Sequence, residues 1–483
     1  MPKPQQRPRA YALLRSRKRV SLAASALAMG LLAACGSDND APPPAQEEEI
    51  AGCDGTVTFA ETEGTFASGT PWNMRRPTKW NGVLINDLDY VGAKDSARSC
   101  YWLMNGYGLS GTARNPQRTY NYDPAREQDE LMQLIDMFAE RYGKPKTVVQ
   151  YGHSGGGFDA LNIAERFGDR VDGVVAGCAH EQVPLMNMMM DGWFVLKTLI
   201  APELKIVGFD DLDTVSEQSA KWKETLSAAQ ETPEGRARIA LAAAIGQWPA
   251  WGTTSVPKPD PEDKAALQEA IFETVLFNAG QPGGQSRFMS EHAGGSPVPR
   301  QLSWNKGIHY EDFLGNAEPM LGALVQALYA DAGLDMKEDL DKLATAERIE
   351  ADPEAIAFWA APGRTVHGTP TIPVLRFHTT GDSLVPPTIM DAYVQKMEAN
   401  GGNTALYRTT VVDRPGHCSF DPSESAAAVD ALLSRINTGI WPDLSPDAMN
   451  ARAKELIPAS EPLFVPFESP RANRPDNAPP EAM

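Results

Sequence analysis

Apolar positions along the chain follow two different periods. Short apolar runs at 82–87, 146–152 and 171–180 predict buried strands, because a strand covered on both faces carries few polar residues. Between them, apolar residues recur every three or four positions across 124–143 and 156–168, which predicts amphipathic helices. Strands separated by helices favour an α/β fold with a mostly parallel central sheet flanked by helices.

This alternation stops at 181–368, where helical and irregular segments dominate, and it resumes after that region. We therefore expect a large, mainly helical cap at 181–368, inserted between two parts of one sheet domain. The expected boundaries place the first part of the core at 53–180 and the second part at 369–440. A proline-rich tail at 441–483 is expected to wrap the surface or to stay partly disordered.

The N-terminal segment has the pattern of an export signal. Four basic residues at 15–19 precede an apolar run at 20–35, which is too short to span a membrane. The run ends in the letters LAAC, the last of which is Cys35, and this resembles the lipobox of bacterial lipoproteins. The resemblance implies that residues 1–35 are a signal peptide and that the Cys35 thiol is lipidated. Since Gly36 follows, it also implies the outer membrane of a Gram-negative cell, and a plain signal peptide stays the alternative.

The mature chain is expected to be strongly acidic. Removing the signal takes away seven basic residues and no acidic one, so the formal net charge falls from −19 to −26. Such a surface repels nucleic acid and anionic lipid, and contact with the membrane is expected through the acyl anchor. The segment 36–52 is rich in proline and acidic residues, which predicts a solvated tether.

The letters GHSGG place Ser154 between a predicted strand and a predicted helix. A GxSxG motif in this setting is typical of a nucleophile elbow. Its glycines let the backbone turn sharply, and the following helix directs its positive end at a developing oxyanion. The alternative is a glycine-rich turn in a nucleotide-binding or structural protein, but no phosphate-binding motif competes with it.

A serine nucleophile needs a histidine base, and that histidine needs a carboxylate to orient it. Asp382 ends an apolar strand pattern in GDSLVP, and His417 follows 35 residues later in GHCSF. Both lie at strand ends, where catalytic loops project over a parallel sheet. An aspartate-initiated turn is the alternative for Asp382, and Glu181, at the end of the preceding strand, is the reserve acid. His180 is expected to line the pocket without acting as the base.

In this order, GHSGG, GDSLVP and GHCSF resemble the α/β-hydrolase superfamily, in particular serine hydrolases of esterase and lipase type. The resemblance covers 80–180 and 371–439, and it implies an α/β-hydrolase fold and a reaction without a cofactor. It also implies an oxyanion hole made of the backbone N–H of Gly155 and a second N–H after the first strand. We expect Asp89 or Tyr90 as this second donor, although the chain lacks the His-Gly pair that many relatives have there.

The cysteines permit two disulfides. If Cys35 carries lipid, four of the five cysteines remain, and four can pair in three ways. No cluster of cysteine and histidine suggests a metal site. Cys418 follows the candidate catalytic histidine, which resembles the tannase and feruloyl esterase group, where this position is tied to a cysteine just before the serine. This chain has a histidine before the serine, so Cys178 is the plausible partner of Cys418, leaving Cys53 to pair with Cys100.

Together these features predict a secreted or outer-membrane-anchored serine hydrolase that cleaves small carboxylic esters through an acyl-enzyme. Ser154 attacks, His417 is the general base and then the general acid, and Asp382 orients His417. The methionine-rich run at 185–194 favours an apolar or aromatic ester, with ordinary cap packing as the alternative. Peptidases and hydrolases of lactones or polyester oligomers stay open on the same fold. A non-catalytic, substrate-binding surface lipoprotein is the alternative of a different class.

Overall fold

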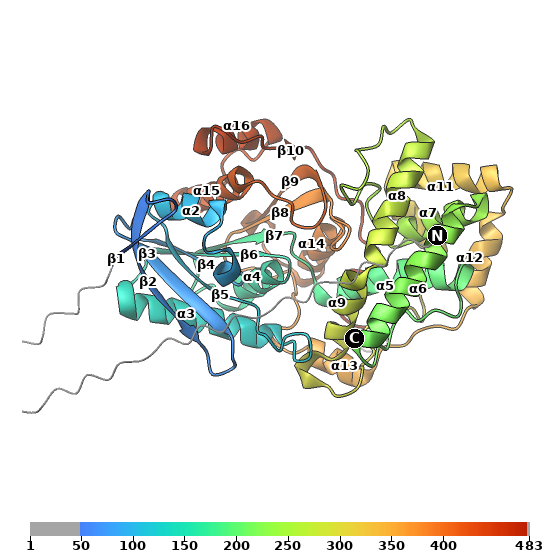
Figure 1. The fold of residues 1–483 in the computed structure, drawn as a ribbon, viewed down its shortest axis with the longest axis horizontal. Coiled ribbons are helices and arrows are strands. Elements are labelled where there is room, and N and C mark those ends of the chain that lie inside the picture. Colours follow the sequence, from blue (N-terminus) through green and yellow to red (C-terminus); the bar gives the residue numbers. More distant parts are fainter. Residues whose placement is uncertain (1–48, 481–483) are drawn as a thin grey trace, which may run out of the picture. The chain divides into compact units, whose positions relative to one another are not determined.

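A ten-stranded sheet forms the centre of the described chain (Figure 1). The structure is a computed structural model that describes residues 49–480, so the expected signal peptide, the lipidation site at Cys35 and most of the tether lie outside the described residues. The strands are, in chain order, β1 (Glu49–Gly52), β2 (Val57–Thr65), β3 (Pro71–Pro77), β4 (Val83–Asp87), β5 (Gly108–Thr112), β6 (Thr147–His153), β7 (Gly173–Gly177), β8 (Val374–Gly381), β9 (Tyr407–Pro415) and β10 (Phe464–Val465).

The order of the strands in the sheet is β1-β2-β3-β5-β4-β6-β7-β8-β9-β10. Strands β5, β4, β6, β7, β8 and β9 run parallel, whereas β1, β2 and β3 at one edge and β10 at the other edge pair antiparallel. In the parallel part, Ile85 of β4 lies opposite Val149 of β6, and Tyr151 of β6 lies opposite Val175 of β7. This strand order, with the expected elbow after β6, confirms the α/β-hydrolase fold.

Helices cover both faces of the sheet, so successive strand residues enter two different cores (Figure 1). Leu84 and Val174 pack toward one face with α3 and α4, while Ile85 and Val175 pack toward the other face with α2 and α15. Burial on both faces explains the continuous apolar runs of these strands. The helices outside the cap region are α1 (Tyr90–Ala93), α2 (Ala97–Met104), α3 (Pro124–Tyr142), α4 (Gly155–Arg166), α14 (Ile389–Asn400), α15 (Pro422–Thr438), α16 (Pro446–Leu456) and the 3₁₀ turn η3 (Thr404–Leu406).

Only helices and irregular segments lie between β7 and β8 in the described chain, in the stretch where the sequence predicts a cap. They share a core around α7, whose small alanines let neighbouring helices approach closely. No helix within residues 49–480 is long and apolar enough to cross a membrane. The elements of this stretch are α5 (Gln182–Leu199), α6 (Leu212–Gln230), α7 (Pro233–Ile245), α8 (Lys264–Asn278), α9 (Gln281–Glu291), η1 (Ala293–Gly295), α10 (Tyr310–Phe313), η2 (Leu314–Asn316), α11 (Pro319–Ala332), α12 (Met336–Thr345) and α13 (Pro353–Trp359).

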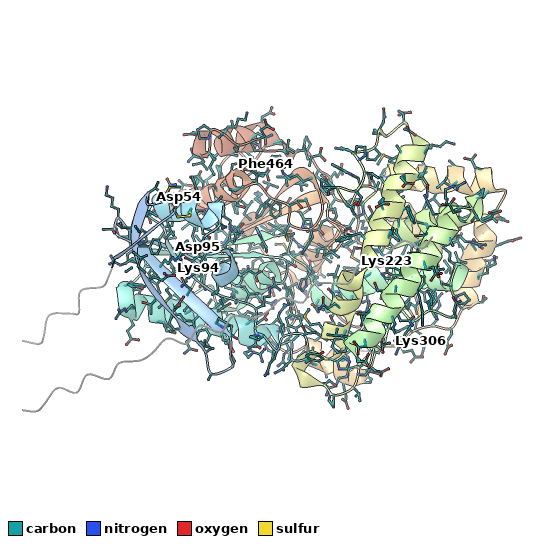
Figure 2. The ribbon with its side chains drawn as sticks, in the orientation of Figure 1. Asp54, Lys94, Asp95, Lys223, Lys306 and Phe464 are labelled. Carbon is teal, nitrogen blue, oxygen red and sulfur yellow. A yellow bond between two sulfur atoms is a disulfide. The ribbon has the colours of Figure 1, made fainter. Side chains whose placement is uncertain are left out.

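The two ends of the described chain are more ordered than the sequence predicts. Residues 49–52 form the edge strand β1 instead of ending the tether. The proline-rich tail contains α16 and β10, and Phe464 of β10 lies opposite Val412 of β9 (Figure 2). Because Phe464 and Arg474 are buried, the tail contributes to the fold and does not merely cover it.

Candidate active site

Ser154 occupies a sharp turn between β6 and α4. Its backbone has φ 55° and ψ −118°, a conformation that residues with a side chain rarely adopt. Two hydrogen bonds hold the turn: the Ser154 N–H donates to the carbonyl of Gly177 at 2.9 Å, and the Ser154 carbonyl accepts from the N–H of Phe158 at 2.9 Å. Neighbouring structure therefore enforces the strained turn that a nucleophile elbow requires.

Gly152 of the motif and Gly157, the residue after it, are required by close contact between β6, α4 and β7. A Cβ atom on Gly152 would lie 2.2 Å from the carbonyl oxygen of Gly156. A Cβ atom on Gly157 would lie 2.8 Å from the carbonyl oxygen of Gly177. The backbone of α4 thus approaches the sheet so closely that only glycine fits at these positions.

The other two members of the expected triad meet at the ends of β8 and β9. Asp382 is fully buried, and its Oδ1 accepts hydrogen bonds from the N–H groups of Leu384 at 3.1 Å and Val385 at 2.9 Å. Its Oδ2 lies 2.7 Å from Nδ1 of His417. Since Nδ1 must donate to the carboxylate, this contact selects the tautomer in which Nε2 can accept a proton.

Ser154 and His417 line the same cavity, which has a volume of about 120 Å³. One part of its wall is apolar, formed by Leu185, Met186, Met189, Met289, Leu384 and Val385. The rest is polar, formed by Arg114, Arg118, Gly155, His180, Gln182 and Ser286. The cavity therefore brings the candidate nucleophile and the candidate base together, with room for a small apolar group beside cationic side chains.

Two disulfides brace the sheet region. Cys178, just after β7, is bonded to Cys418, with Cα atoms 5.5 Å apart, and Cys53 is bonded to Cys100, with Cα atoms 5.6 Å apart. These are the two pairs that the sequence left as plausible once a cysteine just before the serine, the partner in tannases, was found to be missing. Ligand atoms of Cys178, Asp382, His417 and Cys418 lie within 4.8 Å of one another, but the two sulfur atoms are bonded to each other and are not thiolates that could hold a metal.

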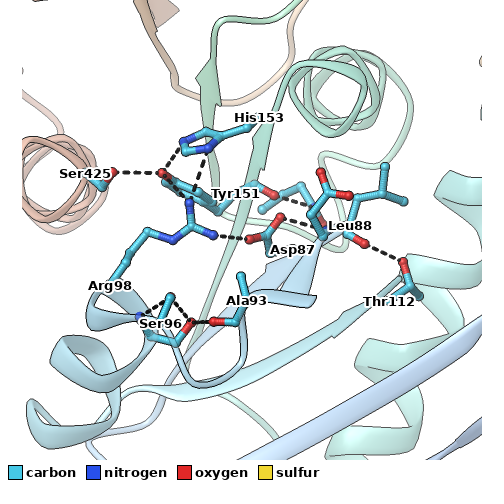
Figure 3. A network of polar contacts seen from close by, with 12 residues as sticks. Asp87, Leu88, Ala93, Ser96, Arg98, Thr112, Tyr151, His153 and Ser425 are labelled. Carbon is cyan, nitrogen blue, oxygen red and sulfur yellow. Dashed lines mark hydrogen bonds and ion pairs between the residues drawn. The ribbon is translucent and has the colours of Figure 1, made fainter. Parts of the chain in front are cut away.

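A polar network holds the strand ends beside the elbow (Figure 3). Arg98 donates to Asp87 at 2.9 Å, the Tyr151 hydroxyl contacts Nε2 of His153 at 2.5 Å, and the same hydroxyl donates to Ser425 at 3.1 Å. Burial raises the pKa of Asp87 to about 6. Burial and the charge of Arg98 lower the pKa of His153 well below its usual range, so this imidazole is neutral.

Comparison with known proteins assigns the chain to a family. No protein-family model matches the sequence. The o-phthalyl amidase of Xanthobacter agilis is 40% identical over 443 residues, which cover 86% of this chain and 97% of that protein. The chain belongs to the family of this amidase. It is therefore an α/β-hydrolase enzyme that hydrolyses an ester or amide bond.

Solved structures of several hydrolases are distantly similar to this chain of the amidase family. An esterase from Aspergillus oryzae has a TM-score of 0.37 and 16% identity, covering 80% of this chain and 81% of that chain. Feruloyl esterase B from the same organism has a TM-score of 0.36 and 14% identity, covering 82% and 85%. Lipase A of Candida antarctica has a TM-score of 0.36 and 12% identity, covering 82% of both chains. These scores are too low to carry an argument about the site.

Of the three oxyanion candidates in this family member, only Gly155 lines the cavity. The Asp89 N–H donates to the Asp87 carboxylate at 3.2 Å, and the Asp89 side chain pairs with Arg114. Tyr90 is buried in the core beside the sheet. Gly155 therefore stays the expected donor, whereas Asp89 and Tyr90 do not line the cavity, because the chain turns into helix α1 immediately after β4.

Glu181 does not contact His417. Its fully buried carboxylate lies 3.2 Å from Arg376 and 2.6 Å from Lys396, so it neutralises two cations beneath the sheet end. His180 lines the cavity as expected and stacks on Phe158 with ring centroids 4.8 Å apart. Burial and the nearby arginines lower the pKa of His180 well below its usual range, so it presents a neutral ring.

Sequence reasoning missed Arg114 and Arg118, which contribute the cationic part of the cavity wall. Both follow β5 within six residues of its end. β5 runs parallel to β4, which in turn runs parallel to β6, so its carboxyl end reaches the edge of the sheet that carries Ser154. Basic residues just after a parallel strand, here β5, are therefore the sequence signal that could have identified Arg114 and Arg118.

Proposed function

We propose that the chain hydrolyses amides or esters of small aromatic carboxylic acids, with Ser154 as the nucleophile. The observation that carries the proposal is the buried Asp382, 2.7 Å from His417, at the same cavity as the strained elbow serine. Ser154 Oγ attacks the carbonyl carbon while His417 takes its proton, and Asp382 stabilises the resulting imidazolium. The N–H of Gly155 and the N-terminal end of α4 stabilise the oxyanion.

Amide hydrolysis is favoured by the family relative, whose name describes cleavage of an o-phthalyl amide. An amine leaves poorly as an anion, so His417 must return its proton to the nitrogen before the bond breaks, and water then releases the acid from Ser154. The apolar wall at Met186, Met189 and Met289 suits an aromatic ring of the acyl group. Esters, which the sequence favoured, are the second substrate class, because the same residues act on a better leaving group.

The test compares the protein with its Ser154→Ala variant in reaction with a fluorophosphonate probe. We expect labelling of the unaltered protein and none of the variant, because the probe forms a covalent bond with an activated serine. Ser286→Ala is the matched control, since Ser286 lines the same cavity and is expected to leave labelling intact. Absence of labelling in the unaltered protein, or equal labelling of Ser154→Ala, would sink the assignment and favour a non-catalytic binding protein.

A substrate panel then separates the reaction classes. It contains a 2-carboxybenzoyl anilide, the corresponding phenyl ester, a short peptide, a lactone and a polyester oligomer. We expect turnover of the anilide and the ester and none of the other three, because only the first two present an aromatic acyl group to the methionines of the cavity wall. Cleavage of the ester alone would overturn the amidase part of the proposal.

We also propose that the chain is exported and anchored in the outer membrane through a lipidated Cys35, on the basis of the LAAC motif and the basic, apolar segment before it. Metabolic labelling with a palmitate analogue tests this. We expect the label on the unaltered protein in the membrane fraction and its loss in Cys35→Ser. An unlabelled protein in the periplasmic fluid would contradict the anchor.

A further inference from the structure

Arg114 and Arg118 form a cationic wall that the expected catalytic triad does not use. We propose that these two side chains bind a carboxylate carried by the acyl group, beside the carbonyl that is attacked, and so determine which acids the enzyme accepts. This inference rests on the proposed function, since it names the residues of the same cavity that bind the acyl group of the substrate.

Both guanidinium groups reach the residue after the nucleophile. The position of a Cβ atom on Gly155 would lie 2.5 Å from Nη1 of Arg114 and 2.8 Å from Nη2 of Arg118. Gly155 also supplies the expected oxyanion donor. An anion held by these Nη atoms therefore lies next to the reacting carbonyl. A small acid can reach both places if its carboxylate and its reacting carbonyl are attached to neighbouring atoms.

The arginines are held from behind by carboxylates, which leaves donors toward the cavity. Arg114 donates through Nε and Nη2 to Asp89 at 2.6 and 2.7 Å, and Arg118 donates through Nε to Glu127 at 2.7 Å. Burial acts to raise the pKa of Asp89, but the hydrogen bond and charge of Arg114 outweigh it and lower this pKa, so the backing carboxylate is ionised. The pairs thus orient the guanidinium planes before any substrate arrives.

Arg118 has an unused donor. Its Nη2 is buried without a hydrogen-bond partner, and its Nη1 donates to the sulfur of Met289 at 3.6 Å, although the side chain is just 11% exposed. A buried guanidinium N–H without a partner is costly, so an incoming carboxylate gains a charge-assisted hydrogen bond there. No described residue that lines the cavity is acidic, so nothing on the wall competes for this donor.

The apolar part of the same wall fits the rest of such an acid. Met186, Met189 and Met289 present polarizable, apolar surface to the cavity, and the sulfur of Met289 lies beside Arg118. An aromatic ring packed on the methionines, with its carboxylate at the arginines, leaves the adjacent carbonyl at Ser154. The geometry therefore favours an aromatic acyl group that carries a carboxylate next to the scissile bond over the same acyl group without the carboxylate.

The experiment compares two matched substrates, 2-carboxybenzanilide and benzanilide. For the unaltered protein we expect kcat/KM to be about 100-fold higher for the carboxylated substrate, the size of one or two charged hydrogen bonds. In Arg118→Gln and Arg114→Gln we expect this ratio to fall to within about 5-fold, chiefly through a higher KM for the carboxylated substrate. Arg118→Lys keeps a charge near Glu127 and is expected to retain an intermediate ratio. Arg170→Gln, which removes an arginine paired with Asp136, is the control with an unchanged ratio.

The outcomes separate the inference from the proposed function. If the arginine variants slow both substrates equally, the arginines act on the oxyanion or on folding, and the carboxylate assignment is overturned. Fluorophosphonate labelling of Ser154 involves no carboxylate and reports on the proposed function alone. Binding can also be measured without catalysis, by calorimetry on the Ser154→Ala variant. We expect this variant to bind phthalate about 10-fold or more tightly than benzoate, and we expect the additional substitution Arg118→Gln to abolish the difference. Equal binding of the two acids would also overturn the assignment.

Discussion

Two histidines approach one carboxylate at the end of β8, and the candidate base, His417, is the nearer of the two. Oδ2 of Asp382 lies 2.7 Å from His417 and 3.5 Å from His378. His378 instead donates through Nε2 to the carbonyl of Val385 at 2.8 Å. Burial lowers the pKa of His378 to about 4, so this side chain is neutral at pH 7. It therefore does not form an ion pair with Asp382 in place of His417.

The neutral state of His378 predicts a loss of stability in acid. The unfolded chain protonates this side chain below its usual pKa of about 6.5, whereas the folded protein does so only below about 4, so the free energy of unfolding falls as the pH drops through this window. We expect a contribution of about 2 kcal/mol between pH 7 and pH 4.5. His378→Gln, which keeps a donor for Val385, should remove that part of the pH dependence.

Urea unfolding at pH 7 and pH 4.5 measures this difference in both proteins. The other histidines whose pKa values are lowered, His153 and His180, are present in both proteins, so their contributions cancel in the comparison. An equal loss of stability in His378→Gln and in the unaltered protein would show that His378 does not contribute.

At the scale of elements, the site depends on how closely α4 approaches the strands beside it. Gly152 and Gly157 lack the side chains that would collide with backbone carbonyls at this contact, and α4 is buried along most of its length. Strand β6 and helix α4 therefore hold Ser154 as a rigid pair, and the loops after β8 and β9 supply Asp382 and His417 to the same edge.

Gly152→Ala tests this contact. The new methyl group would overlap the carbonyl of Gly156 at 2.2 Å, so we expect a loss of about 1–3 kcal/mol in the free energy of unfolding and about 100-fold in kcat/KM as the elbow shifts. Gly322→Ala is the control, because Gly322 lies inside α11 with open space around it and should gain about 0.5–1 kcal/mol. Unchanged activity in Gly152→Ala would contradict the rigid-elbow explanation.

The disulfide after β7 is expected to hold the candidate base, His417, as well as to stabilise the fold. Cys418 follows His417 directly, and its sulfur lies 3.4 Å from Nε2 of the imidazole. Replacing Cys178 and Cys418 by serine should lower the free energy of unfolding by about 2–5 kcal/mol and also reduce kcat. Replacing Cys53 and Cys100 is the matched control: the closed loop spans 47 residues instead of 240, so the loss of stability should be about 1 kcal/mol smaller.

Denaturant unfolding and steady-state kinetics on both double variants check this prediction. The pair at Cys53 lies away from the cavity, so its removal should leave kcat/KM within about 2-fold. Equal losses of activity in the two double variants would indicate a general effect of destabilisation and not a local effect on His417.

At the scale of the whole molecule, the C-terminal tail (441–480) packs against the helical insertion between β7 and β8 and connects it to the rest of the chain. Arg474 pairs with Asp191 of α5 at 2.8 Å and donates to the carbonyl of Trp304, and all three residues are buried. The Asp191 carboxylate also accepts from Tyr310 at 2.8 Å. The tail thus completes a polar cluster inside the insertion from 283 residues away in sequence.

Arg474→Met is expected to lower the free energy of unfolding by about 3–5 kcal/mol, because it leaves the Asp191 carboxylate buried without its cation. Adding Asp191→Leu should recover part of this loss, since the unpaired charge is then gone. Arg471→Met, at an exposed position nearby, should change stability by less than about 0.5 kcal/mol. Thermal unfolding of the four proteins provides the measurement, and an Arg474→Met protein as stable as Arg471→Met would contradict the role of the pair.

Several features of the fold were predictable because their causes are local. Helix α3 shows this: the Asp123 side chain caps its first turn, Pro124 occupies its first position, and Gly143 ends it with φ 98°. The antiparallel strands β2 and β3 were not predicted, because polar and charged residues interrupt the apolar positions in both of them. The tail was also underestimated, since its burial depends on partners far away in the chain.

The sequence by itself determined the alternation of strands and helices, the elbow around Ser154 and the order of the candidate triad, because each depends on short-range periodicity, on glycine or on the rule that parallel strands end at one edge. Only the tertiary structure decided that Asp382 and not Glu181 meets His417. It also decided which side chains line the cavity, including Arg118. These outcomes rest on packing between residues far apart in sequence, and no local pattern encodes the distance between two side chains that the fold brings together.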